Sequence, residues 1–146
     1  MPEKRFKIIP TVYLILAMNN KILLTRRYNT GFHDGEYSFP AGHLNGGETM
    51  ISAMIREAKE EVGITLKPKD LQLVHVMHRK EPSEEMINFF FTAENWEGAP
   101  KIIEPHKCDD LDWFDLDNLP DNVIPYIRQA ITCFKERRFY SEIGWQ

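Results

Sequence analysis

The sequence predicts an α/β fold, because strand-like segments are interspersed with two amphipathic helical segments along its 146 residues. A chain of this length can bury a hydrophobic core without disulfides or a structural metal. It contains no internal repeat, linker or low-complexity segment. We therefore expect a single domain spanning residues 1–146.

Two strands joined by a tight turn are expected at the start of the chain. Residues 6–18 and 21–27 are rich in β-branched and other apolar residues, and Asn19-Asn20 between them favours a turn. Residues 28–35 form a polar, glycine-containing loop. A short extended segment follows at residues 36–42, where Pro40 and Gly42 predict that the chain turns.

The first helix is expected to begin near Glu48-Thr49, with Thr49 as its cap, and to end at Gly63. At about 100° per residue its apolar side chains form one stripe and three glutamates lie on the opposite side. One face of the helix therefore packs and the other is free for chemistry. The stripe consists of Ile51, Met54, Ile55, Ala58 and Val62.

The second half of the chain predicts three more strands and a last helix. Residues 71–80 and 86–96 are strand-like and flank the turn sequence EPSEE. A loop carrying Glu104 leads to a short strand at residues 111–116. Residues 125–138 have helical periodicity, and the aromatic tail after them docks either on the domain, which is favoured, or on a second subunit.

The composition excludes few functions, but it indicates the kinds of partner and the compartment to expect. The formal net charge of −4 argues against broad nucleic-acid binding, although a small anionic ligand needs only a local positive pocket. Cys108 and Cys133 match no zinc spacing and are interpreted as reduced thiols. The apolar run at residues 8–18 is too short to span a bilayer, and no signal peptide is recognised. We expect a cytoplasmic monomer or homodimer without nucleic-acid or membrane partners.

The acidic face of the first helix is the main functional feature. Glu57, Glu60 and Glu61 share this face, and carboxylates so close together repel one another. A divalent cation relieves this repulsion, and hard oxygen ligands suit Mg²⁺ or Mn²⁺, ions that commonly hold phosphate chains. The alternative is a solvated acidic face paired with Arg56 and Lys59.

The helix and the loop before it match the pattern G-x5-E-x7-R-E-U-x-E-E-x-G-U, in which U is aliphatic. In this pattern the chain resembles the MutT/Nudix pyrophosphohydrolases. Only Ala58, at the first aliphatic position, matches the pattern weakly. The resemblance extends to the order of strands and helices. The matching residues are Gly42, Glu48, Arg56, Glu57, Glu60, Glu61, Gly63 and Ile64.

The resemblance implies a Nudix fold, in which a mixed β-sheet is sandwiched between helices. It also implies hydrolysis of a nucleoside diphosphate linked to another group, by attack of water on a phosphorus. Such a reaction needs mainly positioning and cancellation of negative charge, which metal ions supply. The alternative class is a nucleotide-sensing module without turnover, although modules of that kind usually lose the motif glutamates that this chain keeps.

The resemblance further implies individual roles. The carbonyl of Gly42 with Glu57, Glu60 and Glu61 would bind the metal, and Arg56 and Glu48 would support them. A stretch like residues 96–100, W-E-G-x-P, precedes a metal-site glutamate in MutT-type proteins, which makes Glu104 a fourth candidate ligand; the alternative is a solvated loop carboxylate. Glu57, Glu60 and Glu104 are all candidates for the general base that activates the water, and the sequence does not choose among them.

The resemblance points to a nucleoside triphosphate of the MutT type as substrate, an oxidised one included, which gives monophosphate and pyrophosphate. Arg27 ends a strand as a nucleotide-contacting arginine does in that group, and Phe39 either stacks on a base or packs in the core. His43 is near enough to touch phosphate. In MutT-like enzymes an asparagine reads the purine, and Asn122 lies near the corresponding position. Alignment on Pro125, however, places Val123 at that position. ADP-ribose, a nucleotide sugar and a dinucleoside polyphosphate are the alternative substrates.

Overall fold

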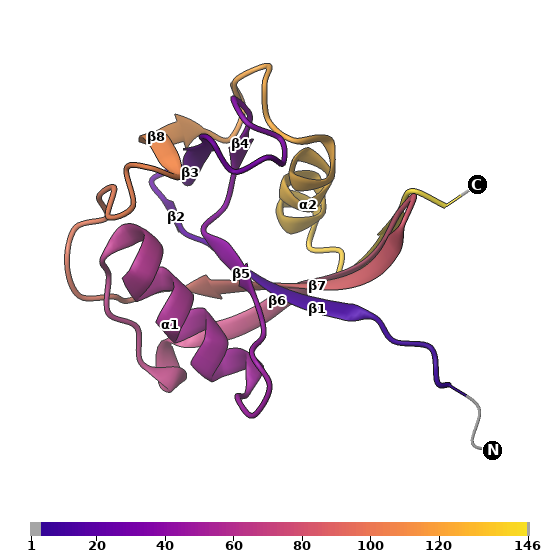
Figure 1. Cartoon of the computed structure of the whole chain (residues 1–146). Helices are drawn as coiled ribbons and strands as arrows, with labels where there is room; N and C mark the ends of the chain where they lie inside the picture. The colour runs from indigo at the N-terminus through magenta and orange to yellow at the C-terminus, as the bar shows by residue number, and fades with distance from the viewer. Residues whose placement is uncertain (1–3, 146) are drawn as a thin grey trace.

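Two β-sheets form the middle of the molecule, and one helix lies on each side of them (Figure 1). The structure is a computed structural model that describes residues 4–145. It confirms the predicted mixed α+β fold with strands between two helices. No helix within the described residues is long and apolar enough to cross a membrane.

The larger sheet has five strands in the order β5-β1-β7-β6-β9. β1 (Ile9–Ile15) pairs in parallel with β7 (Glu84–Ala93) and antiparallel with β5 (Ala41–His43). β6 (Leu71–Glu81) pairs antiparallel with β7 and in parallel with β9 (Tyr140–Ile143). The sheet is therefore mixed, as predicted.

The smaller sheet is antiparallel. In it β3 (Lys21–Arg27) pairs with β2 (Ala17–Met18), β4 (Tyr37–Ser38) and β8 (Cys108–Asp115). The turn between β2 and β3 is the predicted Asn19-Asn20 turn, and both residues have positive φ, at 54° and 61°. Asparagine tolerates this conformation, which the tightest hairpin turns require.

The prediction of one strand over residues 6–18 was wrong in one respect. The segment forms two strands, β1 and β2, which belong to different sheets and are separated at Leu16. All of residues 11–16 are buried, so the apolar run is uninterrupted where the chain passes from one sheet to the other. An apolar run alone does not show such a break.

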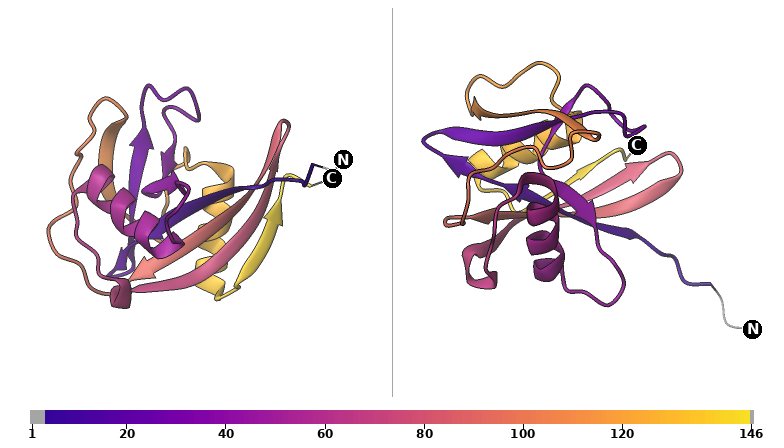
Figure 2. Two further views of the ribbon diagram at one scale, coloured as in Figure 1. Left: turned by 60° about the horizontal axis from the view of Figure 1, so that its bottom comes forward. Right: turned by 60° about the vertical axis from the view of Figure 1, so that its left-hand side comes forward.

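The two helices cover opposite faces of the strands (Figure 2). α1 (Met50–Val62) packs against Val12 and Leu14 of β1, and α2 (Pro125–Glu136) packs against Tyr13 and Ile15 of the same strand. Side chains alternate between the faces of a strand, so β1 contributes to both cores. A short 3₁₀ helix, η1 (Pro68–Asp70), leads into β6.

The ends of α1 are those that the sequence predicts. The hydroxyl of Thr49 accepts a hydrogen bond from the backbone N–H of Ser52, and Gly63 ends the helix with a φ of 74°. A cap of this kind satisfies one of the unpaired N–H groups of the first turn. The acidic helix is thus placed by local sequence signals.

The aromatic tail docks on the domain, as the sequence favoured, but it does so as an edge strand, β9, which the sequence did not predict. β9 pairs with residues 76–79 of β6, and the indole N–H of Trp145 donates to the carbonyl of His78. Gly144 passes so close to the carbonyl of Lys80 that a Cβ atom would overlap it. The rings of Phe139, Tyr140 and Trp145 stay partly exposed.

Candidate active site

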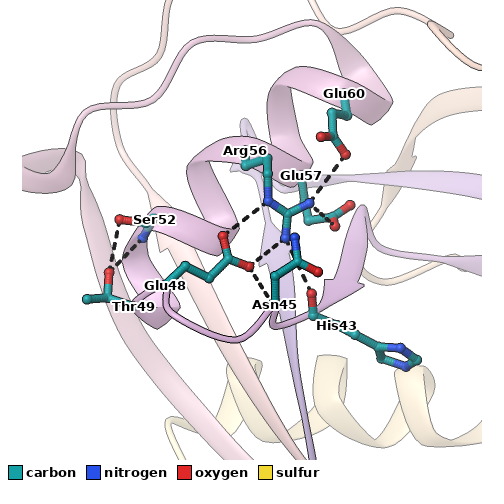
Figure 3. Close-up of polar contacts among 8 residues, drawn as sticks. All are labelled: His43, Asn45, Glu48, Thr49, Ser52, Arg56, Glu57 and Glu60. Carbon is teal, nitrogen blue, oxygen red and sulfur yellow. Dashed lines mark hydrogen bonds and ion pairs between the residues drawn. The ribbon is translucent and has the colours of Figure 1, made fainter.

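Arg56 lies at the centre of an ion-pair network on the acidic face of α1 (Figure 3). Its Nη2 is 2.7 Å from Oε1 of Glu48, and its Nη1 is 2.7 Å from Oε1 of Glu57 and 3.4 Å from Oε2 of Glu60. Glu60 is one helical turn beyond Arg56, whereas Glu48 comes from the loop before the helix. One guanidinium therefore fixes three carboxylates relative to one another.

The loop before the helix is held by the same network. Glu48 accepts a hydrogen bond of 2.7 Å from the backbone N–H of Asn45, and Nη2 of Arg56 lies 3.4 Å from the carbonyl oxygen of His43. The hydrogen bonds from Arg56 and from the backbone of Asn45 lower the pKa of Glu48. Glu48 is therefore an ionised group that joins the loop to the helix.

Gly42 allows β5 to lie directly against the acidic face. A Cβ atom at this position would overlap the carboxylate of Glu57. The neighbouring residue, Ala41, donates its backbone N–H to Oε2 of Glu61 at 3.0 Å. Only a residue without a side chain fits between the strand and Glu57, which explains the glycine at the start of the sequence motif.

The electrostatics of this region show an excess of negative charge. Burial raises the pKa of Glu61 to about 8, and repulsion from Glu57 and Glu104 adds to the increase. Burial also raises the pKa of Glu57, more than the attraction of Arg56 lowers it. Both shifts favour the protonated forms of Glu57 and Glu61, as expected of groups that need a cation.

A cleft of about 730 Å³ brings the acidic helix and the remote loop together. Glu57, Glu60 and Glu61 line it, as does Glu104, which reaches it from the loop between β7 and β8. The repulsion between Glu104 and both Glu57 and Glu61 reflects their proximity. The four predicted carboxylates thus face one space.

Three of the four predicted substrate residues line the same cleft, namely Arg27, Phe39 and His43. Nε of Arg27 donates to the carbonyl of Phe32 at 2.6 Å, so this arginine also holds the adjoining loop. Phe39 is only 2% exposed and belongs to the core as well. Its burial supports packing in the core, and stacking on a base stays a prediction.

Asn122 is not among the residues that line the cleft. Its side-chain Nδ2 donates to the carbonyl of Gly35 at 2.8 Å, and its own carbonyl accepts from the backbone N–H of Tyr37. These bonds hold the loop over residues 28–35 against the start of α2. Val123, the alternative at this place in the alignment, is buried in the core.

Sequence reasoning missed several residues that line the cleft, among them Thr11, Arg79 and Tyr126. Arg79 is 4% exposed, and its guanidinium lies 3.9 Å from the centre of the Tyr126 ring. Alternation along β6 is the signal that identifies it, because His75, Met77 and Arg79 share one face of the strand and the first two are buried.

The residues present suit a divalent cation in their chemistry. They are hard oxygen donors, and the raised pKa values of Glu57 and Glu61 mark a place where positive charge is favoured. Within residues 4–145, however, no three side chains of His, Cys, Asp or Glu already surround one point closely enough to hold an ion. Arg56 contacts two of the candidate ligands, Glu57 and Glu60.

The mixed sheet between two helices and the carboxylate-lined cleft are the features by which this class of protein is defined. Comparison with known protein families identifies the family. The profile of the NUDIX domain matches residues 7–132. The chain therefore belongs to the NUDIX family, as its resemblance to the sequence motif implies. Nudix hydrolases in general depend on a divalent metal and act on small nucleotide substrates.

Two curated relatives and one solved structure illustrate the similarity. An ADP-ribose pyrophosphatase from Methanocaldococcus jannaschii is 36% identical over 106 residues, which are 73% of this chain and 61% of that protein. An 8-oxo-dGTP diphosphatase from Escherichia coli is 33% identical over 118 residues, 80% of this chain and 90% of that protein.

The structure of a MutT NUDIX hydrolase from Burkholderia pseudomallei superposes with a TM-score of 0.80 at 26% identity and covers 87% of this chain and 98% of that one. This chain thus spans less than two thirds of the archaeal relative but nearly all of the two bacterial proteins. The family and the names of these relatives support a pyrophosphohydrolase enzyme.

Proposed function

We propose that this protein is a Mg²⁺- or Mn²⁺-dependent pyrophosphohydrolase that cleaves a nucleoside triphosphate, an oxidised one included, into monophosphate and pyrophosphate. The observation that carries the proposal is the single cleft, in which the carboxylates of α1 and Glu104 face the same space as Arg27 and His43. Similarity over 90% of the length of the Escherichia coli 8-oxo-dGTP diphosphatase supports the choice of substrate class.

The metal would be held by the carbonyl of Gly42 with Glu57, Glu60, Glu61 and Glu104. When bound, a divalent ion neutralises charge on the phosphate oxygens and lowers the pKa of a coordinated water. These ligands are all hard oxygen donors, which favours Mg²⁺ or Mn²⁺ over softer transition metals.

The other residues of the site position and balance these groups. Arg56 orients Glu48, Glu57 and Glu60, and Glu48 secures the loop that follows Gly42. A carboxylate among Glu57, Glu60 and Glu104 accepts the proton of the attacking water, and the phosphoanhydride bond breaks with pyrophosphate as the leaving group. Arg27 and His43 bind the phosphate chain, and Phe39 contributes to the wall of the cleft.

The proposal extends to the type of substrate, the state of assembly and the compartment. The substrate is a free nucleotide rather than a nucleic acid, since the net charge of −4 gives no general affinity for a polyanion. We propose a single domain that acts as a monomer or homodimer in the cytoplasm. The free thiols of Cys108 and Cys133 are compatible with that compartment.

A second candidate substrate is ADP-ribose, because the relative with 36% identity is an ADP-ribose pyrophosphatase. The two substrates share a phosphoanhydride bond and differ in their products. Hydrolysis of ADP-ribose gives two phosphomonoesters and no pyrophosphate. A nucleotide sugar would also give two phosphomonoesters, whereas a dinucleoside polyphosphate would give two nucleotides, and neither releases pyrophosphate.

A substrate panel tests the proposal. Purified protein is incubated with nucleoside triphosphates, their oxidised forms, ADP-ribose and dinucleoside polyphosphates, with Mg²⁺, with Mn²⁺ or with EDTA. Pyrophosphate is measured directly, and phosphomonoesters are measured after phosphatase treatment. We expect metal-dependent release of pyrophosphate from at least one triphosphate. Hydrolysis of ADP-ribose alone would support the second candidate, and no hydrolysis of any compound would leave only a nucleotide-binding role.

A further inference from the structure

The loop between β3 and β4, over residues 28–36, borders the cleft directly after Arg27 and has an irregular backbone. Thr30 and Phe32 of this loop line the cleft. Four of its residues have positive φ, between 50° and 84°, namely Asn29, Gly31, His33 and Gly35. A segment with so many left-handed residues does not continue the regular pairing of the strands. Its shape therefore depends on hydrogen bonds made by its own side chains.

The carboxylate of Asp34 accepts three of these hydrogen bonds. Its Oδ1 accepts from the backbone N–H of Thr30 at 2.9 Å and from the Thr30 hydroxyl at 2.6 Å, and its Oδ2 accepts from the N–H of Gly31 at 2.9 Å. These bonds lower the pKa of Asp34, so the group is ionised at neutral pH. Asp34 is not itself among the residues that line the cleft.

The hydroxyl of Thr30 connects Asp34 to Arg27. Its Oγ1 lies 3.0 Å from Nη2 of Arg27 and 3.2 Å from the backbone nitrogen of Phe32. A hydroxyl has one proton to donate and two lone pairs with which to accept. The carbonyl of Phe32, at 3.0 Å, is a second possible acceptor for the proton, but the Asp34 carboxylate is nearer and charged. The proton therefore goes to Asp34, and the lone pairs face the two donors.

The guanidinium of Arg27 is held by the loop and keeps its charge available to the cleft. Nε donates to the carbonyl of Phe32 at 2.6 Å, and the Phe32 ring centre lies 5.3 Å from the guanidinium carbon. Within residues 4–145, Nη1 of Arg27 makes no hydrogen bond and the guanidinium makes no ion pair with a carboxylate. The positive charge acts across the cleft on Glu61, where it opposes the increase in pKa.

We propose that Asp34 is a positioning residue for binding of the phosphate chain, because it holds Arg27 in its binding orientation through the hydroxyl of Thr30. This inference rests on the proposed function, in which Arg27 binds the phosphate chain. An arginine side chain loses rotamer entropy when a ligand fixes it. Contacts that fix the side chain beforehand remove this cost from the binding step, so they strengthen binding without touching the substrate.

Asp34→Ala tests the inference. We expect KM for the preferred triphosphate to rise about three- to tenfold, while kcat changes by less than about twofold because the metal site is untouched. Arg27→Ala should also raise KM, and adding Asp34→Ala to it should have no further effect, since the residue that Asp34 positions is then absent.

Asp117→Ala is the matched control for loss of an aspartate that holds a loop. Asp117 accepts hydrogen bonds of 3.1 Å from Asn20 and from Lys135, and none of these three residues lines the cleft. The melting temperature of this variant should fall, as that of Asp34→Ala should, but its KM should equal that of the wild-type protein. General loosening of a loop is thereby separated from positioning of Arg27.

Two substitutions of Thr30 test the same connection independently. Thr30→Val keeps the shape of the side chain and removes the hydroxyl, so KM should rise as in Asp34→Ala. Thr30→Ser keeps the hydroxyl and should retain most of the wild-type affinity. This comparison decides the question even where Asp34→Ala does not fold.

Binding of inorganic pyrophosphate in Mg²⁺, measured by calorimetry, separates this inference from the proposed function. An inactive wild-type protein whose Kd for pyrophosphate rises alike in Asp34→Ala and Arg27→Ala, and no further in the double variant, would support the inference and overturn the hydrolase proposal. Unchanged KM and Kd in Asp34→Ala and Thr30→Val, or effects of Asp34→Ala that add fully to those of Arg27→Ala, would overturn the inference and leave an active protein a hydrolase. A wild-type protein that neither hydrolyses nucleotides nor binds pyrophosphate would overturn both.

Discussion

Arg56 Nη2 and Glu48 Oε1 lie 2.7 Å apart and join the acidic helix to the loop that precedes it. The pair is partly exposed, with 28% and 17% of the two side chains accessible. A partly exposed pair of this kind contributes little to stability because water and salt screen it. Its importance is geometric, because the same guanidinium also contacts Glu57 and Glu60.

Arg56→Lys is therefore expected to lower activity far more than stability. An ammonium group cannot replace the planar guanidinium that contacts three carboxylates at once. We expect kcat to fall about ten- to hundredfold, as for other residues that position metal ligands, and the melting temperature to change by only a few degrees. Arg138→Lys, which alters the exposed pair with Glu136, is the matched control and should leave both unchanged.

Gly42→Ala should disrupt the contact between β5 and α1. The added Cβ would overlap the carboxylate of Glu57, so the strand or the glutamate has to move, at a cost of about 1–3 kcal/mol. Activity should fall with stability. Gly46→Ala is the matched control, because a Cβ at Gly46 meets no atom within 4 Å. Equal melting temperatures and equal rates in the two variants would show that Gly42 is not needed for this close approach.

The stability of the metal-free protein should decrease as pH rises. In the folded state Glu61 holds its proton up to about pH 8, whereas the unfolded chain releases it near its ordinary pKa of 4.5. Between these values the folded state binds more protons than the unfolded state, so the contribution of Glu61 is fully present below pH 4.5 and is lost as pH approaches 8.

Thermal unfolding in EDTA across this range measures the effect. Glu61→Gln carries no titratable group and should show a weaker decrease than the wild-type protein. Mg²⁺ should raise the melting temperature of the wild-type protein most at the alkaline end, where the carboxylate is free to bind it. Parallel curves for the two proteins in EDTA would mean that Glu61 ionises normally.

Glu104→Gln distinguishes a metal-site residue from a solvated loop carboxylate. If Glu104 acts on the metal, the concentration of Mg²⁺ needed for half-maximal activity should rise about ten- to hundredfold. Glu97→Gln, which changes a side chain of the same loop that is 70% accessible, should have no effect. Identical Mg²⁺ dependence of both variants and the wild-type protein would remove Glu104 from the site.

The sequence predicts those parts of the structure that depend on local signals. The cap at Thr49, the end at Gly63 and the acidic face of α1 follow from residue type and spacing, and all three are confirmed. The Asn19-Asn20 turn is confirmed for the same reason. The ion pairs of Arg56 and the hydrogen bond between Asn45 and Glu48 lie within residues 42–64, so this part of the site follows from the motif itself.

The features that the sequence did not predict depend on pairing between distant segments. The division of residues 6–18 between two sheets and the addition of β9 to β6 both depend on partners far away in the chain. Arg79 was missed because a charged residue in a strand is usually solvated, whereas here Glu81 and Tyr126 compensate for its burial.

The assignment of the acidic face of α1 as the metal site is tested by the rate of pyrophosphate release in Mg²⁺ by the wild-type protein and by Glu60→Gln. The side chain of Glu60 is 52% exposed, so its replacement should leave the fold and the melting temperature intact. We expect metal-dependent release by the wild-type protein and a loss of about a hundred- to ten-thousandfold in the variant. A folded Glu60→Gln protein that turns over at the wild-type rate would contradict the assignment of the acidic helix as the metal site.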